Sequence, residues 1–207
     1  ELDEIAPAIL ECWFLGIEAG NAIADILFGD YNPSGRLSIS FPRQVGQVPT
    51  YYNRNRTSHA NPTGTTDISF KLRYANCSLF PLYPFGHGIS YTTFEYSDLM
   101  VPDEMKRGET LTVTVKVKNT GTVTGTETIQ LYIEDLIAEL VRPQRELKAI
   151  KQVTLAPGEE TTVVLEITEE SLSYHHRDFT HRADSGEFKV YVGHDSTTQY
   201  GAVFNLI

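Results

Sequence analysis

Residues 111–117 read Leu-Thr-Val-Thr-Val-Lys-Val, an alternation of apolar and polar side chains with a period of two. This period predicts a β-strand with one buried face, because successive side chains point to opposite sides of a strand. The same alternation returns at residues 129–133, 163–167 and 188–192. The C-terminal half of the chain is therefore expected to be all-β.

Turn formers and further apolar runs fill the rest of this half. Asn119-Thr120-Gly121 and Ala156-Pro157-Gly158 are turn signals, and shorter runs lie near 94–101, 145–155 and 199–207. Seven or eight short strands in about 115 residues are typical of an immunoglobulin-like or fibronectin-III-like sandwich, which we predict for residues 93–207. The Cys…Trp…Cys pattern is absent, so an antibody-type domain is disfavoured.

The first 45 residues have a different pattern. Residues 18–28 place apolar side chains on one helical stripe, and Gly29 follows as a helix C-terminal residue. Residues 36–41 alternate Leu37, Ile39 and Phe41 with polar residues, which predicts a half-buried strand. One helix and one strand cannot bury their own apolar faces, so we expect residues 1–45 to pack against other elements as part of something larger.

Residues 46–92 form a connection without sustained periodicity. A stretch of this length without regular structure is usually functional or a linker, and this one is too aromatic for a free linker. Its aromatic residues are Tyr51, Tyr52, Phe70, Tyr74, Phe80, Tyr83, Phe85 and Tyr91. We expect a long loop that lies on the surface of a neighbouring domain.

Composition excludes several classes of protein. Lys and Arg number 17 against 27 Asp and Glu, a formal net charge of −10, which is unlike a nucleic-acid-binding protein. The longest apolar region, 5–17, is interrupted by Pro7 and Glu11, so no membrane span is expected. The two cysteines, Cys12 and Cys77, form neither a disulfide framework nor a zinc framework and are expected as free thiols, with a disulfide as the alternative in a secreted protein.

Catalytic patterns are missing from the chain. The sequence has no G-x-S-x-G, H-E-x-x-H, P-loop or G-x-G-x-x-G motif, and no convincing carboxylate pair for glycosidic chemistry. Glu18 is interpreted as a carboxylate at a helix N-terminus. His175, His176 and His181 could be read as metal ligands, but a solvated hairpin is the favoured interpretation. We therefore expect no catalytic residue, metal or cofactor in this chain.

One basic, aromatic segment is a candidate for sugar binding. Tyr51, Tyr52, Arg54, Arg56 and His59 lie close together in an acidic chain. Aromatic faces and planar donors suit the faces and hydroxyls of a sugar ring. The alternative is a solvated basic loop whose surface ion pairs contribute little.

Several runs resemble glycoside hydrolase family 3. Residues 13–37 (WFLGIEAGNAIADILFGDYNPSGRL) resemble the end of its α/β sandwich domain, and residues 82–94 (LYPFGHGISYTTF) resemble the passage into its fibronectin-III-like domain. Arg142-Pro143, residues 146–148 (ELK) and residues 155–159 (LAPGE) are similar to signatures of that second domain. The resemblance is strongest to the periplasmic β-glucosidase branch, and it implies an origin in the periplasm or outside the cell.

The resemblance also implies a division of labour. Family members are retaining enzymes whose Asp nucleophile lies in a preceding barrel domain and whose acid/base Glu lies earlier in the α/β domain. Neither motif occurs here, so the implied partners are an N-terminal catalytic part, a β-glucoside or oligosaccharide, and in one alternative a second copy of the chain. The competing hypothesis is a stand-alone carbohydrate-binding or adhesion β-sandwich.

Overall fold

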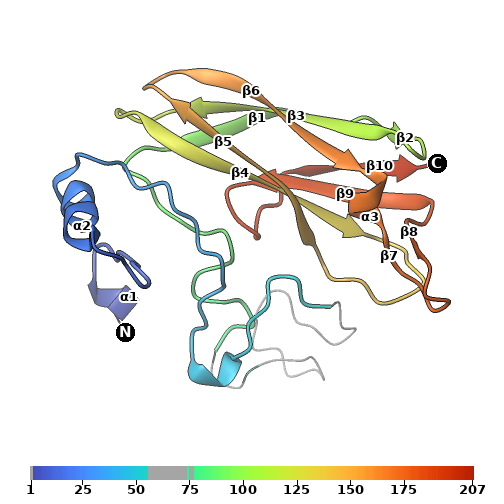
Figure 1. Ribbon diagram of the computed structural model, residues 1–207, viewed down its shortest axis with the longest axis horizontal. Coiled ribbons are helices and arrows are strands. Elements are labelled where there is room, and N and C mark those ends of the chain that lie inside the picture. Colours follow the sequence, from blue (N-terminus) through green and yellow to red (C-terminus); the bar gives the residue numbers. More distant parts are fainter. Residues whose placement is uncertain (1, 56–73, 75–76) are drawn as a thin grey trace.

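The computed structural model describes residues 2–55, 74 and 77–207. Figure 1 shows a two-sheet sandwich at one side of the molecule and the helices of the N-terminal region at the other, with extended segments running between them. The predicted fold class is confirmed: the chain is mainly β, with a sandwich that follows a short helical region.

The sandwich contains a three-stranded and a five-stranded sheet. The first has the order β1 (Phe94–Met100), β3 (Thr110–Asn119), β6 (Glu160–Thr168). The second has the order β2 (Glu104–Met105), β10 (Gly201–Leu206), β9 (Gly186–Gly193), β4 (Gly125–Asp135), β5 (Glu146–Leu155). All neighbours are antiparallel except β2 and β10. After β6 come α3 (Glu169–Leu172) and a small hairpin of β7 (Tyr174–His175) and β8 (His181–Arg182).

The core lies between the two sheets and consists of the residues that the alternation predicts. Val113, Val115 and Val117 on β3 are fully buried, and Val115 pairs with Val163 of β6 in register. Ile129 and Leu131 of β4 are buried in the same cluster. Every strand predicted from the sequence between 94 and 207 is present, since each buries one apolar face in this common core.

The N-terminal region contains α1 (Leu2–Ile5), α2 (Ala19–Phe28) and the short 3-10 helix η1 (Val45–Gln47). The predicted helix over 18–28 is confirmed by α2, which ends at Gly29 in the left-handed conformation, φ 85°. The predicted strand over 36–41 is wrong. Among the described residues Phe41 makes only an isolated bridge with Tyr83, and a strand requires a neighbour along its whole length.

The connection returns alongside this segment and lies on the sandwich. The Gly86 amide donates to the Leu37 carbonyl at 2.7 Å, and the Leu37 amide donates to the His87 carbonyl at 2.8 Å. On its other side the Gly86 carbonyl accepts from Gln130 Nε2 of β4 at 3.2 Å. Residues 37 and 86–87 therefore cover part of the outer face of β4, which explains why β4 is buried on both faces.

Gly86 should be essential at this contact for two separate reasons. Its φ is +84°, and a Cβ there would overlap the Gln130 side-chain amide, whereas Gly108 has a similar φ of +76° with nothing within 4 Å. Gly108→Ala should cost about 1 kcal/mol from backbone strain alone. Gly86→Ala should cost about 3 kcal/mol, because overpacking adds to the strain. Urea unfolding of both variants measures the difference, and equal losses would contradict the close approach to Gln130.

Candidate functional site

A buried ion pair joins the N-terminal region to the sandwich. Arg36 Nη2 donates to Glu127 Oε2 at 2.6 Å, and the two side chains are 9% and 2% exposed. The Tyr96 hydroxyl donates to the other carboxylate oxygen of Glu127 at 2.6 Å. Burial, together with the neighbouring Glu127 charge, raises the pKa of Tyr96, which keeps this phenol protonated as the donor. Residue 36 is thereby fixed at the end of the space between the two sheets.

Asn32 provides a second attachment. Its Nδ2 donates to the Thr124 carbonyl at 2.9 Å, and its Oδ1 accepts from Ser90 Oγ and from the Tyr91 amide, both at 2.8 Å. The sequence indicates a turn here, and the structure shows that the turn also holds three separate segments together. The region after α2 therefore has a fixed position relative to the sandwich.

His87 lies next to Gly86 at this junction. Its ring stacks on Tyr83 with centroids 5.2 Å apart, and its Nδ1 lies 4.0 Å from Asp195 Oδ2. His194 approaches the same Asp195 oxygen at 3.5 Å. Burial is the main cause that lowers the pKa of His87, against the opposing attraction of Asp195.

A groove of about 300 Å³ opens beside this junction. One wall comes from residues 47–54 and 79–84 of the connection, and the other comes from sandwich loops. The side chains that suit a sugar are Tyr51, Phe80, Arg54, Gln144 and Arg145. Arg54 lies with its guanidinium carbon 5.9 Å from the centre of the Phe80 ring. The groove thus combines aromatic faces with planar hydrogen-bonding groups.

The structure places three of the five predicted binding residues at this groove. Tyr51 is 66% exposed, and Arg54 is half-buried at the groove wall. Tyr52 stacks on Phe85 with centroids 4.2 Å apart, and its hydroxyl accepts from the Leu147 amide at 3.2 Å. The Tyr52 ring therefore supports the wall from within. Arg56 and His59 lie outside the described residues.

Gln144 and Arg145 were not identified from the sequence. They lie in the loop between β4 and β5, about 90 residues from Arg54, and no local pattern connects the two segments. Arg145 Nη1 donates to the carbonyls of Ser196 and Thr198 at 2.7 and 2.8 Å, so it also holds the loop between β9 and β10. The only relevant signal is the Arg142-Pro143 pair two residues earlier, which marks the family domain rather than a site.

The histidine-rich hairpin differs in part from its expected form. His175 and His181 are exposed, as a solvated hairpin requires. The interpretation is wrong for His176, whose side chain is 0% exposed: it stacks on Tyr174 and contacts Glu139 of the β4–β5 loop. In the part of the chain that the structure describes, no group of three His, Cys, Asp or Glu side chains could hold a metal ion. Cys12 and Cys77 are both free thiols.

Comparison with known families decides the identity of this architecture. Residues 1–91 match the model described as glycosyl hydrolase family 3 C-terminal domain, and residues 127–196 match the fibronectin type III-like domain. The chain belongs to glycosyl hydrolase family 3. The resemblance of the sequence runs to this family is thereby confirmed.

Proteins similar in sequence to this chain are named as glycosidases. The chain is 45% identical over 207 residues to the periplasmic β-glucosidase of Salmonella typhimurium, covering 99% of this chain and 27% of that protein. It is 40% identical over 194 residues to a β-xylosidase of Formosa agariphila, covering 93% and 26%. The chain spans about a quarter of the length of these relatives.

Solved structures of the family share the fold closely. A mutant β-glucosidase from Listeria innocua in complex with laminaribiose superimposes with a TM-score of 0.94 at 39% identity, covering 100% of this chain and 28% of that one. The glycosyl hydrolase family 3 β-glucosidase of Bifidobacterium adolescentis superimposes with a TM-score of 0.74 at 29% identity, covering 95% and 29%. The packing of the two regions against each other is therefore a family arrangement.

The junction of this family 3 chain should weaken in mild acid. The pKa of His87 is lowered from 6.5 in the folded state, so the unfolded state takes up the proton first as the pH falls below 6.5. The contribution of neutral His87 to stability is present above that pH and is lost below it. His87→Phe, which keeps the stack on Tyr83, should therefore flatten the decline of the unfolding free energy between pH 7 and 5.

The control for this measurement is His175→Phe, the same substitution at an exposed histidine. Its stability should follow the wild-type pH profile. Parallel profiles for wild type and His87→Phe would show that His87 does not titrate differently in the folded state.

Proposed function

We propose that the chain acts as the C-terminal portion of a retaining, exo-acting β-glucosidase-like hydrolase. In this proposal the nucleophile and the acid/base residue lie in an N-terminal catalytic part, and this chain contributes none of the catalytic residues. It supports the active site and supplies part of the rim that receives the leaving sugar. The relatives named β-glucosidase and the Listeria innocua complex with laminaribiose support this choice of substrate class.

The observation that carries the proposal is the apolar surface of the N-terminal region. Phe14 and Ile17 are fully exposed, at 104% and 101%, and α2 has no buried residue. Further exposed apolar side chains of the region are Ile5, Ile9, Leu10, Trp13, Leu15, Leu27, Phe28, Ile39, Val45 and Val48. An isolated helix of ten residues is only marginally stable, so α2 requires a further protein surface. That surface is proposed to be the rest of the α/β sandwich domain.

The groove supports the second part of the proposal. Tyr51 and Arg54 present an aromatic face and a charged planar donor beside it, and Gln144 faces them from the sandwich. Arg56 and His59, from the same segment of the sequence, are proposed to extend this rim, with Tyr52 as its support. Such a rim contacts the leaving group more than the bond that is cleaved.

A second candidate function is a stand-alone carbohydrate-binding or adhesion module. A sandwich of that kind typically binds sugars with exposed aromatic residues, but the single Trp of the chain, Trp13, lies in the N-terminal region.

We propose a periplasmic or secreted location for this chain, because one of its relatives is named a periplasmic β-glucosidase. Among the described residues no helix is long and apolar enough to cross a membrane. We further propose, as an addition to the N-terminal catalytic part, that two copies of this chain could pair as a homodimer.

The proposal that the catalytic residues lie outside this chain can be tested by measuring activity. The purified chain alone should not hydrolyse aryl β-glucosides, because a covalent mechanism requires a nucleophile. Co-expression with the proposed N-terminal catalytic part should give one complex by native mass spectrometry, and that complex should hydrolyse the substrate. Hydrolysis by the pure chain, or failure of the two parts to associate, would contradict the proposal.

The rim predicts a selective kinetic effect in the complete enzyme. Arg54→Ala should raise KM for cellobiose several-fold, about 1 kcal/mol for one lost hydrogen bond, with kcat nearly unchanged. Aryl glucosides with small leaving groups should be affected less, since they do not reach the rim. Lys118→Ala, at an exposed position on β3, serves as the control. Equal KM values for Arg54→Ala and wild type on both substrates would show that the segment around Arg54 is a surface loop without a role in substrate binding.

A further inference from the structure

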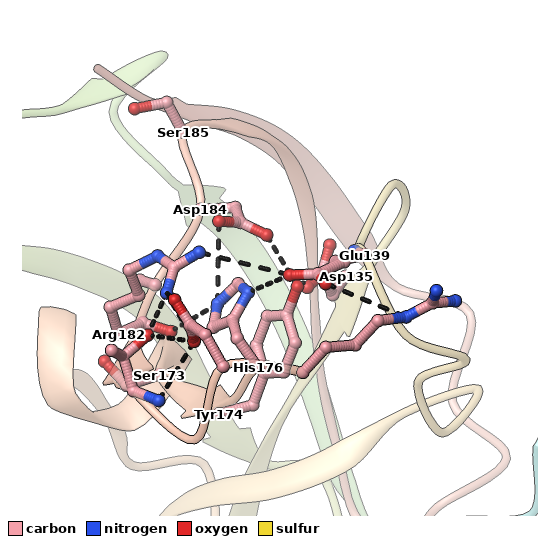
Figure 2. Close-up of polar contacts among 12 residues, drawn as sticks. Asp135, Glu139, Ser173, Tyr174, His176, Arg182, Asp184 and Ser185 are labelled. Atoms are coloured by element: carbon pink, nitrogen blue, oxygen red, sulfur yellow. Dashed lines mark hydrogen bonds and ion pairs between the residues drawn. The ribbon is translucent and has the colours of Figure 1, made fainter.

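A polar cluster with a buried centre connects the β7–β8 hairpin to the loop between β4 and β5. We name it the His176 cluster, and it consists of Glu139, Arg142, Tyr174, His176 and Asp184. Figure 2 shows Glu139 and Asp184 joined by dashed lines to the His176 ring, with Tyr174 beside it. No part of the proposed mechanism uses these residues, although the polar groups of His176 and Tyr174 are buried and therefore need partners.

His176 is the centre of the cluster. Its Nδ1 lies 2.7 Å from Glu139 Oε2, and its Nε2 lies 3.3 Å from the Arg182 carbonyl and 3.6 Å from Asp184 Oδ1. The His176 side chain is 0% exposed, whereas its carboxylate partners Glu139 and Asp184 are in part open to water. A hydrogen bond to a charged group is stronger than one between neutral groups. Glu139 is thereby held firmly against the hairpin.

A stack of rings fixes the same loop at a second point. The Tyr174 ring lies on His176 with centroids 4.2 Å apart, and the Arg142 guanidinium lies 4.5 Å from the centre of the Tyr174 ring. The Tyr174 hydroxyl donates to Asp184 Oδ2 at 2.5 Å and accepts from the Glu139 amide at 2.9 Å. Arg142 Nη2 also donates to Glu146 Oε2 at 2.7 Å. The loop is therefore held at residues 139 and 142, on either side of a short segment.

The opposite edge of this loop pairs with the candidate rim. The Gln144 amide donates to the Arg54 carbonyl at 2.9 Å, and Asn55 forms a bridge with Pro143. Gln144 is two residues from Arg142, a distance of about 7 Å along the chain at most. A displacement of the Arg142 anchor would therefore move the residues that pair with 54 and 55.

Among the described residues, the rim segment (residues 51–55) has few backbone contacts. It forms neither helix nor strand, its backbone pairs with 143–144, and the Tyr52 side chain packs on Phe85 and accepts from the Leu147 amide. Segments with few backbone contacts open locally at low free energy, which reduces the precision of any site built on them. The loop that pairs with residues 54–55 is held on one side by the His176 cluster and on the other by Arg145, which donates to the carbonyls of Ser196 and Thr198.

We propose that the His176 cluster is a positioning device that sets the place of Arg54 through the β4–β5 loop. None of its residues lines the groove, and their role in sugar binding rests on the proposed function of the groove. The positioning itself does not depend on that function, because the cluster would restrain the backbone of residues 51–55 whether or not the groove binds a sugar.

Amide hydrogen exchange on the 207-residue chain tests the positioning. Glu139→Ala removes the partner of His176, and exchange at Gln144 and in residues 51–55 should accelerate at least tenfold. Glu139→Gln keeps an acceptor for His176 Nδ1 and should restore most of the protection. Glu170→Ala, an exposed glutamate on α3, should behave as wild type. Core amides such as Val115 should stay protected in every variant.

A milder variant guards against misfolding. Tyr174→Phe keeps the ring stack but removes the hydroxyl that bonds to Asp184 and the Glu139 amide, so it should accelerate exchange at Gln144 by a smaller factor. If exchange at Gln144 stays within twofold of wild type in both Glu139→Ala and Tyr174→Phe, the positioning role is overturned.

Kinetics of the complete enzyme separate this inference from the function on which it rests. Glu139→Ala should raise KM for a disaccharide several-fold with kcat within twofold, and Glu139→Gln should recover it. Faster exchange at Gln144 with an unchanged KM would uphold the positioning and refute the role of Arg54 in substrate binding. Unchanged exchange with a raised KM would refute the positioning.

Discussion

The buried ion pair between Arg36 and Glu127 is the contact on which the arrangement of the two regions depends. It joins residues 91 positions apart, and Glu127 shares the inward face of β4 with Ile129 and Leu131. Breaking a buried pair by removing one partner typically costs about 3–5 kcal/mol, because the other charge stays buried alone. The Tyr96 hydroxyl satisfies the second carboxylate oxygen, so the charge of Glu127 has partners from both the N-terminal region and the other sheet.

The outer face of β4 extends this junction toward the groove. Gln130 and Tyr132 lie on the face of β4 that points away from the core. Both side chains are nevertheless buried, because the connection covers this face. The Tyr132 hydroxyl donates to Gln130 Oε1 at 2.5 Å, and the Tyr52 ring packs edge-on against Tyr132 at 5.9 Å. Burial raises the pKa of Tyr132, so its hydroxyl remains a donor. This polar layer places residues 51–54 beside the loops of the sandwich.

The groove and the His176 cluster follow from that placement. The connection supplies one wall, and the loops after β4 and β9 supply the other. Figure 1 shows the β4–β5 loop and the β7–β8 hairpin at the same end of the sandwich. The fibronectin-like domain is thus more than a passive addition to the α/β region, since its loops are in direct contact with the segment that is proposed to bind sugar.

The sequence alone determined the sandwich, because strand periodicity is a local property. The alternation of 111–117 and its repeats each require one buried face, and only a shared core satisfies all of them. The end of α2 at Gly29 and the turn at Asn119 were predictable for the same reason. The side chain of Asn119 was not: it is fully buried, and its Nδ2 donates to the carbonyls of Val123 and Leu155.

Tertiary structure alone decided the features that depend on distant partners. Residues 36–41 carry a strand pattern, yet a strand forms only where a neighbour supplies hydrogen bonds along it, and Tyr83 supplies one bridge. His176 has the sequence surroundings of a solvated hairpin, yet it is buried in contacts that include Glu139, 37 residues away. The groove likewise combines Arg54 with Gln144. Local patterns specify which face of an element is apolar, whereas long-range contacts decide what covers that face.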